Sequence, residues 1–258
     1  MPYPKLRRIL AMMYPSVQRK PMIHGLFEVD VTTARGLLQA HRMATGESLS
    51  FTAFILTCFA YTVGEDTSLQ ACRKGSRHLT LFDSVDVALP IEREIDGQSQ
   101  PIIAIIRAAN TKTFRAIHDE IRAAQMGQAT QVWAGFSAAS WLRLLPMVVI
   151  RVGWALFCWL RHMFPPLQKH YGGTVGLTAV GMFGKGGGWG IPLNDHALDV
   201  TVGGIAMKPG IVAGEMVIRD YLSITLSINH GLIDGAPAAR FAQRFKERIE
   251  KADFVSCL

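Results

Sequence analysis

The chain has 258 residues, the upper end of what one domain usually spans, and its 49% hydrophobic and 18% charged content excludes an intrinsically disordered protein. Its four scattered cysteines exclude a disulfide framework and a zinc site, and they fit a reducing compartment. The net charge of +7 is unevenly distributed, because no acidic residue occurs between residues 121 and 194. Such a basic region is expected to bind a phosphate-bearing cofactor, an acidic carrier protein or anionic lipid. No nucleic acid is expected, because the sequence has no nucleic-acid-binding motif.

The N-terminal half predicts strands alternating with helices. Residues 25–31 read as a strand, followed by a helix opened by Thr32 or Thr33 as its cap. A mostly apolar, buried helix follows, with Ser48 or Ser50 as its cap, and it ends at Gly64. Residues 81–92 and 100–109 are rich in β-branched residues and flank a polar turn, which predicts two strands. Residues 111–125 then carry the apolar spacing of an amphipathic helix.

Three further strands are predicted in the C-terminal part, at residues 172–184, 196–210 and 216–229. In the last of them apolar and polar residues alternate from Tyr221 to Ile228, so one face should be apolar and the other polar. The final helix takes Pro237 in its first turn and should bury Phe241 and Phe245. The whole reads as one mixed α/β domain over residues 1–258.

The segment INHGLIDGAPAARF, residues 228–241, is the first candidate for chemistry. A polar strand face that ends at Asn229-His230 would place the imidazole at the rim of a sheet, where a substrate can reach it. Such a histidine can act as a general base toward a thiol or hydroxyl, with Asp234 fixing the local geometry across the turn at Gly235. The alternative is a solvated histidine before a helix whose cap is Asp234.

Other catalytic motifs are incomplete. The glycine-rich run at residues 184–188 lacks the serine or threonine that follows lysine in a P-loop, and GFSAA at residues 135–139 departs from a nucleophile elbow. None of the eight histidines is paired with glutamate or another histidine at metal-ligand spacing, so no metal site is expected.

Three sequence blocks resemble the catalytic domain of dihydrolipoamide acyltransferases, the E2 subunits of 2-oxoacid dehydrogenase complexes, and the wider superfamily of chloramphenicol acetyltransferase. LSINHGLIDGAPAARF is similar to the family's DHRxxDGA strand end and Ala-Ala-Arg-Phe helix. GGTVGLTAVGMFG is similar to GGTFTISNLGMFG, and SLSFTAFILTCFAYTV to LSVNDFILKAVALAL, in the right order. The resemblance implies a chloramphenicol acetyltransferase-like mixed-sheet sandwich with flanking helices, covering nearly the whole chain except roughly residues 133–170.

The resemblance also implies site residues and an assembly. His230 matches the histidine that deprotonates the acceptor thiol, hydroxyl or amine, and Thr178 takes the place of the serine whose hydroxyl stabilises the tetrahedral oxyanion. Thr178 is otherwise an ordinary strand residue. Asp234 matches a mainly structural aspartate, expected to pair with Arg7 or Arg8. The family forms trimers in which the histidine of one subunit faces the hydroxyl of the next, so a homotrimer is expected.

The sequence departs from the family pattern in ways that bear on which acyl donor is expected. Gly231 stands where the family has arginine, and Thr178-Ala179 replaces serine-asparagine. No lipoyl domain precedes the matched blocks, so we expect a free-standing acyltransferase that takes its acyl group from coenzyme A or from the phosphopantetheine of an acyl carrier protein, without a tightly bound cofactor. A condensation-domain-like bond-forming enzyme and a non-catalytic E2-like scaffold are the alternatives.

The apolar, basic insertion within residues 133–170 has no counterpart in the matched blocks. Trp141 to Pro166 holds three tryptophans, and arginine is its only formally charged residue type. Arg151 and Pro146 interrupt it, which disfavours a membrane span. A peripheral membrane contact or a lid over an acyl-chain tunnel is expected, with a core or oligomer-interface helix as the alternative. Because no signal peptide is evident, the expected location is the cytoplasm, with membrane association left open.

Overall fold

The computed structural model describes residues 8, 11–12, 20–95, 98–128, 132–133, 145–181, 186–193 and 195–256. The helices are α2 (Thr32–Thr45), α3 (Phe51–Gly64), α4 (Phe114–Gln125), α5 (Met147–Met163), α6 (Pro165–Gly172), α7 (Gly235–Lys251) and α8 (Asp253–Ser256). The strands are β1 (Met22–Asp30), β2 (Cys72–Lys74), β3 (His78–Thr80), β4 (Val87–Ile95), β5 (Gln98–Ile106), β6 (Val132–Trp133), β7 (Val175–Ala179), β8 (Leu198–Val212) and β9 (Glu215–Asn229).

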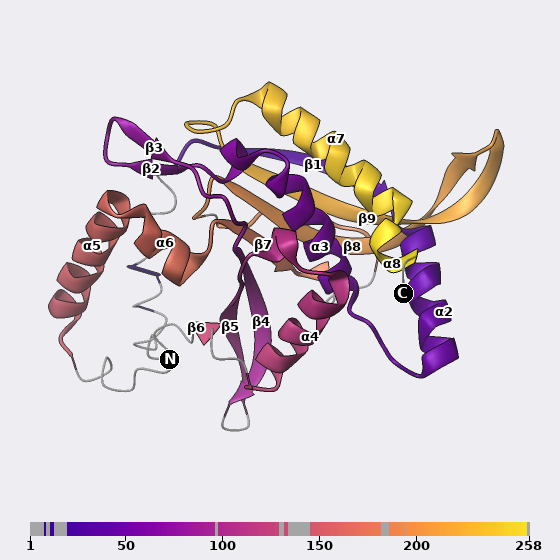
Figure 1. The fold of residues 1–258 in the computed structure, drawn as a ribbon, viewed down its shortest axis with the longest axis horizontal. Coiled ribbons are helices and arrows are strands. Elements are labelled where there is room, and N and C mark those ends of the chain that lie inside the picture. The colour runs from indigo at the N-terminus through magenta and orange to yellow at the C-terminus, as the bar shows by residue number, and fades with distance from the viewer. Residues whose placement is uncertain are drawn as a thin grey trace.

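A mixed sheet organises the fold. Among the described residues it has seven strands in the order β1-β9-β8-β7-β4-β5-β6. The middle strands β4, β7 and β8 run parallel, and the strands on both sides of them pair antiparallel. Strands β2 and β3 form a separate hairpin. The expected mixed α/β architecture with flanking helices is confirmed, and Figure 1 shows α3, α4 and α7 on one side of the sheet.

The helix caps follow local side-chain chemistry. Ser50 accepts a hydrogen bond from the backbone N–H of Ala53 at 3.3 Å, so Ser50 is the cap of α3, as one of the two predicted serines. The predicted threonine cap of α2 is wrong. That helix begins at Thr32, whose hydroxyl donates to the Asp30 carboxylate at 2.6 Å, and its N-cap position is Val31, without a side-chain bond. The oxygen of that hydroxyl accepts from the backbone N–H of Asp220 on β9 at 2.8 Å, so it is bonded to the sheet rather than to the first turn of the helix.

The two faces of β9 differ as the alternation predicts, but both are buried. Leu222, Ile224, Leu226 and Ile228 belong to the same core cluster as the buried phenylalanines of α3 and α7. On the opposite face Ser223, Thr225 and Ser227 are fully buried as well. The glycine-rich segment 186–193 contributes to this cover, since the Gly188 N–H donates to the Ser223 hydroxyl at 3.2 Å. The polar face is therefore an interior surface rather than a solvated one.

Strands β8 and β9 continue beyond the rest of the sheet as a two-stranded ribbon. Strand β1 pairs with β9 only as far as Tyr221, whereas the β8–β9 pairing goes on to Val212 and Glu215. The ribbon projects at one end of the molecule in Figure 1. An ion pair between Asp30 and Arg219, at 2.6 Å, fixes its base to the end of β1.

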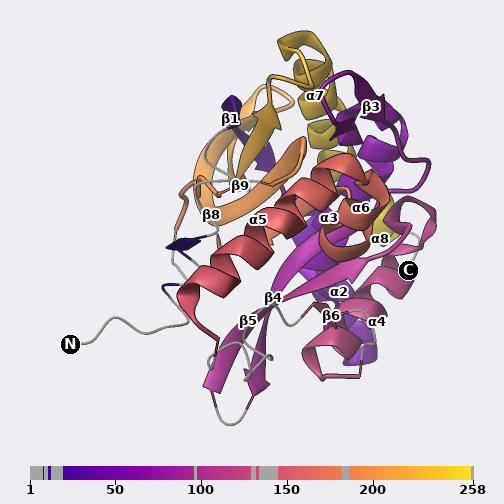
Figure 2. The same ribbon diagram turned by 90° about the vertical axis from the view of Figure 1, so that its left-hand side faces the viewer.

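The described part of the insertion forms helices α5 and α6 at the periphery, on the side of the molecule that faces the viewer in Figure 2. Ile150 is the one buried residue of α5, so a core helix is the wrong interpretation. Residues 141–144 lie outside the described residues. In the described part of the chain, no single helix is long and apolar enough to cross a membrane, and α5 and α6 meet that criterion only as a pair bent by 115°.

Candidate active site

A cavity opens where the short strand β7 ends. Strand β7 has five residues, while its neighbours β4 and β8 have nine and fifteen. Beyond Ala179 the two longer strands therefore continue without a residue of β7 between them, at the carboxyl ends of parallel strands. This is the position in an α/β sheet where ligands commonly bind. The cavity there has a volume of about 860 Å³, within the range of small-molecule sites.

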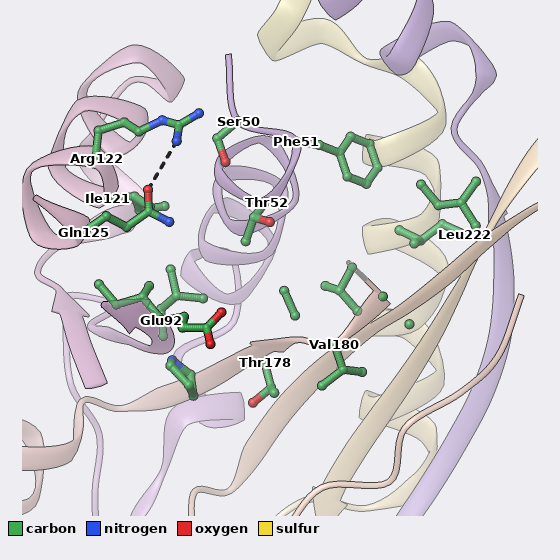
Figure 3. A pocket seen from close by; sticks show the side chains of 18 of the residues that line it. Ser50, Phe51, Thr52, Glu92, Ile121, Arg122, Gln125, Thr178, Val180 and Leu222 are labelled. Atoms are coloured by element: carbon green, nitrogen blue, oxygen red, sulfur yellow. Dashed lines mark hydrogen bonds between the residues drawn. The ribbon is translucent and has the colours of Figure 1, made fainter. Parts of the chain in front are cut away.

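The cavity is lined by both polar and apolar side chains. Figure 3 shows Thr178 and Glu92 from the sheet on one side, and Ser50, Arg122 and Gln125 from the helices on the other. The Arg122 guanidinium donates to the Gln125 side chain at 3.3 Å. The larger apolar residues that line the cavity are Leu49, Phe51, Leu89, Ile91, Ile121, Val180, Val202, Ile205 and Leu222. Such a surface can hold an apolar group beside a hydroxyl.

Thr178 lies in this cavity and begins a row of three threonines across the sheet. Its register partner on β8 is Thr201, whose partner on β9 is Thr225. Thr178 is partly exposed and lines the cavity, but the hydroxyls of Thr201 and Thr225 are buried and have no hydrogen-bond partner among the described residues. Within this row Thr178 is the threonine that lines the cavity.

His230 lies at the rim of the sheet, directly after β9, as predicted. Its backbone N–H donates to the carbonyl of Pro21 at 2.8 Å, which fixes the chain at this point. Its side chain is 49% exposed, and its Nδ1 lies 3.9 Å from a carboxylate oxygen of Asp234, whose side chain is 87% exposed. The imidazole is therefore open to a ligand or to another subunit, and the pair with Asp234 is too exposed to add much stability.

Asp234 occupies the N-cap position of α7, but its side chain makes no capping hydrogen bond. The alternative interpretation placed Asp234 at the N-cap of the helix, and that position is correct. The capping hydrogen bond that it implied is absent among the residues that the structure describes. Arg7, one of the two predicted partners of Asp234, lies outside the described residues. Arg8 is exposed and, in the described part of the chain, forms no ion pair with Asp234.

The structure does not bring His230 and Thr178 together within one chain. Thr178 is two strands away from Thr225, and His230 follows Thr225 by five residues along β9. With strands about 4.8 Å apart and about 3.3 Å per residue along a strand, the two Cα atoms are roughly 20 Å apart. A general base must lie within hydrogen-bond reach of the group it serves, so these two residues cannot serve one site of the same subunit.

A buried ionic pair near the start of β7 was not predicted from the sequence. His196 Nδ1 lies 2.7 Å from the Asp199 carboxylate, and His196 Nε2 lies 2.8 Å from the carbonyl of Gly172. Both ring nitrogens thus face acceptors, which an imidazolium satisfies with two N–H donors. Burial by itself lowers the pKa of His196, but the Asp199 carboxylate, with smaller contributions from Asp195 and the Gly172 carbonyl, raises the pKa above its ordinary value.

Comparisons with known proteins agree with this fold. Residues 166–256, which include Thr178, His230 and Asp234, match the model of the 2-oxoacid dehydrogenases acyltransferase catalytic domain. The lipoamide acyltransferase component of the branched-chain alpha-keto acid dehydrogenase complex of Bacillus subtilis (strain 168) is 23% identical over 239 residues. That alignment covers 90% of this chain and 47% of the relative, so the chain spans about half the length of that protein.

Solved structures extend the likeness over the whole chain. The dihydrolipoamide acetyltransferase of Azotobacter vinelandii superimposes with a TM-score of 0.69 at 17% identity, covering 99% of this chain and 92% of that one. A chloramphenicol acetyltransferase superimposes with a TM-score of 0.53 at 17% identity, covering 94% of this chain and 93% of that one. The chloramphenicol acetyltransferase-like fold class is therefore confirmed. Residues 166–256 carry the sequence pattern of the 2-oxoacid dehydrogenase acyltransferase catalytic domain, and the chain as a whole takes the fold of its catalytic cores.

Proposed function

We propose that this protein is an acyltransferase in which His230 is the general base and Thr178 stabilises the oxyanion. The imidazole takes the proton of an acceptor thiol, hydroxyl or amine, which attacks the carbonyl carbon of an acyl thioester. The carbonyl oxygen of the tetrahedral intermediate accepts a hydrogen bond from the Thr178 hydroxyl. Collapse of the intermediate breaks the carbon–sulfur bond, and the leaving thiolate takes the proton back from the imidazolium.

One observation supports this assignment above the others. The Azotobacter vinelandii structure comes from an investigation of the catalytic roles of a serine, a histidine 52 positions later and an asparagine four positions after that. In this chain His230 likewise follows Thr178 by 52 positions, and Asp234 follows His230 by four. Threonine keeps the hydroxyl donor of serine, and aspartate keeps the carbonyl-type oxygen of asparagine.

The separation of the two residues leads to the proposed assembly. Because His230 and Thr178 are roughly 20 Å apart in one chain, the histidine must come from a neighbouring copy. The exposed imidazole at the sheet rim is free to enter a neighbour's cavity. A closed homotrimer places each histidine against the next subunit's threonine, so that three equivalent sites form.

The cavity supports a donor with a bulky apolar acyl group. An acetyl group would leave most of about 860 Å³ unfilled, whereas a longer chain could contact Phe51, Val180 and Leu222. We propose a thioester of coenzyme A or of an acyl carrier protein as the donor. Coenzyme A is then a substrate, and no tightly bound cofactor is required.

Single substitutions test the two roles. Activity is followed as release of free thiol from acyl-coenzyme A donors of increasing chain length. His230→Ala should reduce turnover on the order of a hundredfold or more while the thermal unfolding temperature stays unchanged. Thr178→Ser should retain activity, and Thr178→Val should lose much of it because a methyl group cannot donate to the oxyanion. Near-normal turnover by a folded His230→Ala protein would contradict the mechanism.

A mixing experiment tests the shared site. His230→Ala and Thr178→Val proteins, each inactive, are unfolded together and refolded as an equal mixture. A site is intact when its histidine comes from one variant and its threonine from the other, so about one site in four should recover in a closed assembly. Mixing the two folded stocks without exchange is the control and should stay inactive. Mixed assemblies that transfer no acyl group would mean that the residues do not share a site, and a wild-type trimer inactive with every donor would fit a non-catalytic scaffold.

A further inference from the structure

Helix α5 presents a continuous apolar stripe to solvent. Val148, Val152, Leu156, Trp159 and Met163 recur every three or four residues, so their side chains lie along one side of the helix. Their exposed fractions are 70%, 63%, 55%, 57% and 38%. The stripe is about 22 Å long, and exposed apolar surface of this extent is typical of a docking surface.

The opposite side of α5 holds the helix against the protein. Ile150 is buried, and the Phe157 ring packs edge-on against Tyr171 of α6 with ring centres 5.9 Å apart. Arg161 forms an ion pair with Asp195, which precedes β8. Figure 2 shows α5 on the outer side of the molecule. The stripe is thus held outward by fixed contacts on the other side of the same helix.

The formally charged residues of α5 are both arginines. Arg151 and His162 are exposed on α5, and the sequence has no acidic residue between residues 121 and 194. Two copies that packed stripe against stripe would bring these basic groups together and leave them without counter-charges. An anionic surface would neutralise them while it covers the apolar side chains.

We infer that α5 docks onto an anionic membrane surface, lying in its plane with the stripe inserted among the lipid headgroups. A convex helix flanked by basic residues, with tryptophan on its apolar side, has the chemistry of an interfacial helix. The lid alternative is less favoured, because no described residue of α5 lines the cavity that holds Thr178. This membrane contact does not depend on acyl transfer.

Vesicle co-sedimentation tests the inference without any activity assay. The 258-residue protein is mixed with vesicles of phosphatidylcholine alone, or of phosphatidylcholine with phosphatidylglycerol. We expect binding to the anionic vesicles, weaker binding at high salt, and little binding to the neutral ones. Leu156→Glu and Trp159→Glu should each weaken binding about tenfold or more, because a carboxylate in the stripe resists transfer into the headgroup region.

Matched control variants distinguish binding through the stripe from non-specific binding to vesicles. Met43 on α2 is 81% exposed, so Met43→Glu adds the same charge at an exposed apolar position outside α5 and should bind like wild type. Leu156→Met keeps an apolar side chain and should also bind. The inference is wrong if wild type binds neither vesicle, or if Met43→Glu loses binding as strongly as Leu156→Glu. It is also wrong if Leu156→Glu dissociates the lipid-free oligomer by light scattering, because the stripe would then be an interface between copies.

Discussion

A single methyl group at Gly176 should break the buried pair of His196 and Asp199. Gly176 lies on β7, opposite Asp199 on β8. A Cβ atom at this position would lie 2.0 Å from the nearer Asp199 carboxylate oxygen and 3.0 Å from His196 Nδ1. Carbon and oxygen atoms normally stay about 3.3 Å apart, so the carboxylate must move by more than an ångström. That movement removes its 2.7 Å contact with the imidazole.

The size of the effect follows from the burial of the pair. Both side chains are only 11% exposed, and breaking a buried ion pair typically costs about 3–5 kcal/mol. We therefore expect Gly176→Ala to lower the free energy of unfolding by about 3 kcal/mol near pH 6. The measurement is urea unfolding followed by circular dichroism, with the midpoint and slope fitted together.

Gly36→Ala is the matched control. Gly36 is exposed on α2, and a Cβ atom there would have nothing within 4 Å. The same chemical change should stabilise the protein by about 0.5–1 kcal/mol, because alanine is the better helix former. If Gly176→Ala cost less than about 1 kcal/mol, the carboxylate would not be held against β7 as described, and the argument from close packing would fail.

Two further predictions concern stability. The raised pKa of His196 means that its contribution is fully present below the ordinary value of 6.5 and is lost as the pH rises through the folded-state pKa. The free energy of unfolding of wild type should thus fall as the pH rises above about 6.5 and passes through the folded-state pKa. His196→Gln should remove this pH-dependent loss of stability, as measured by urea titrations at a series of pH values. Phe241 is fully buried, with its ring centre 6.0 Å from Phe59 and 5.7 Å from Phe245. Phe241→Ala should cost about 3–5 kcal/mol in the same unfolding experiment, and Phe241→Leu clearly less.

Local features of the fold could be predicted from the sequence because their causes are local. Ser50 caps the helix that follows it, and the alternation from Tyr221 to Ile228 gives the two faces of β9. The cap at Thr32 failed because its hydroxyl oxygen accepts from the Asp220 N–H of β9, a long-range contact that propensity alone does not anticipate. The burial of the polar face of β9 also escaped prediction, since its cover includes a glycine-rich segment distant in sequence.

The candidate site also has features that could be predicted from the sequence and features that could not. His230 at a sheet rim was predictable, because the strand ends there and a turn follows. The placement of Glu92 and Arg122 in the same cavity as Thr178 was not, because it depends on the parallel contact of β4 with β7 and on where α4 packs. The pairing of His196 with Asp199 left only a weak signal, a spacing of three residues at the start of a strand.

The distance between His230 and Thr178 has a consequence for the kinetics. If each site takes one residue from each of two subunits, a dissociated monomer has no turnover, however well it folds and binds the donor. Specific activity should then fall as the enzyme is diluted below the dissociation constant of the assembly. Catalytic output would rise faster than in proportion to protein concentration in that range, which makes expression level a control on flux.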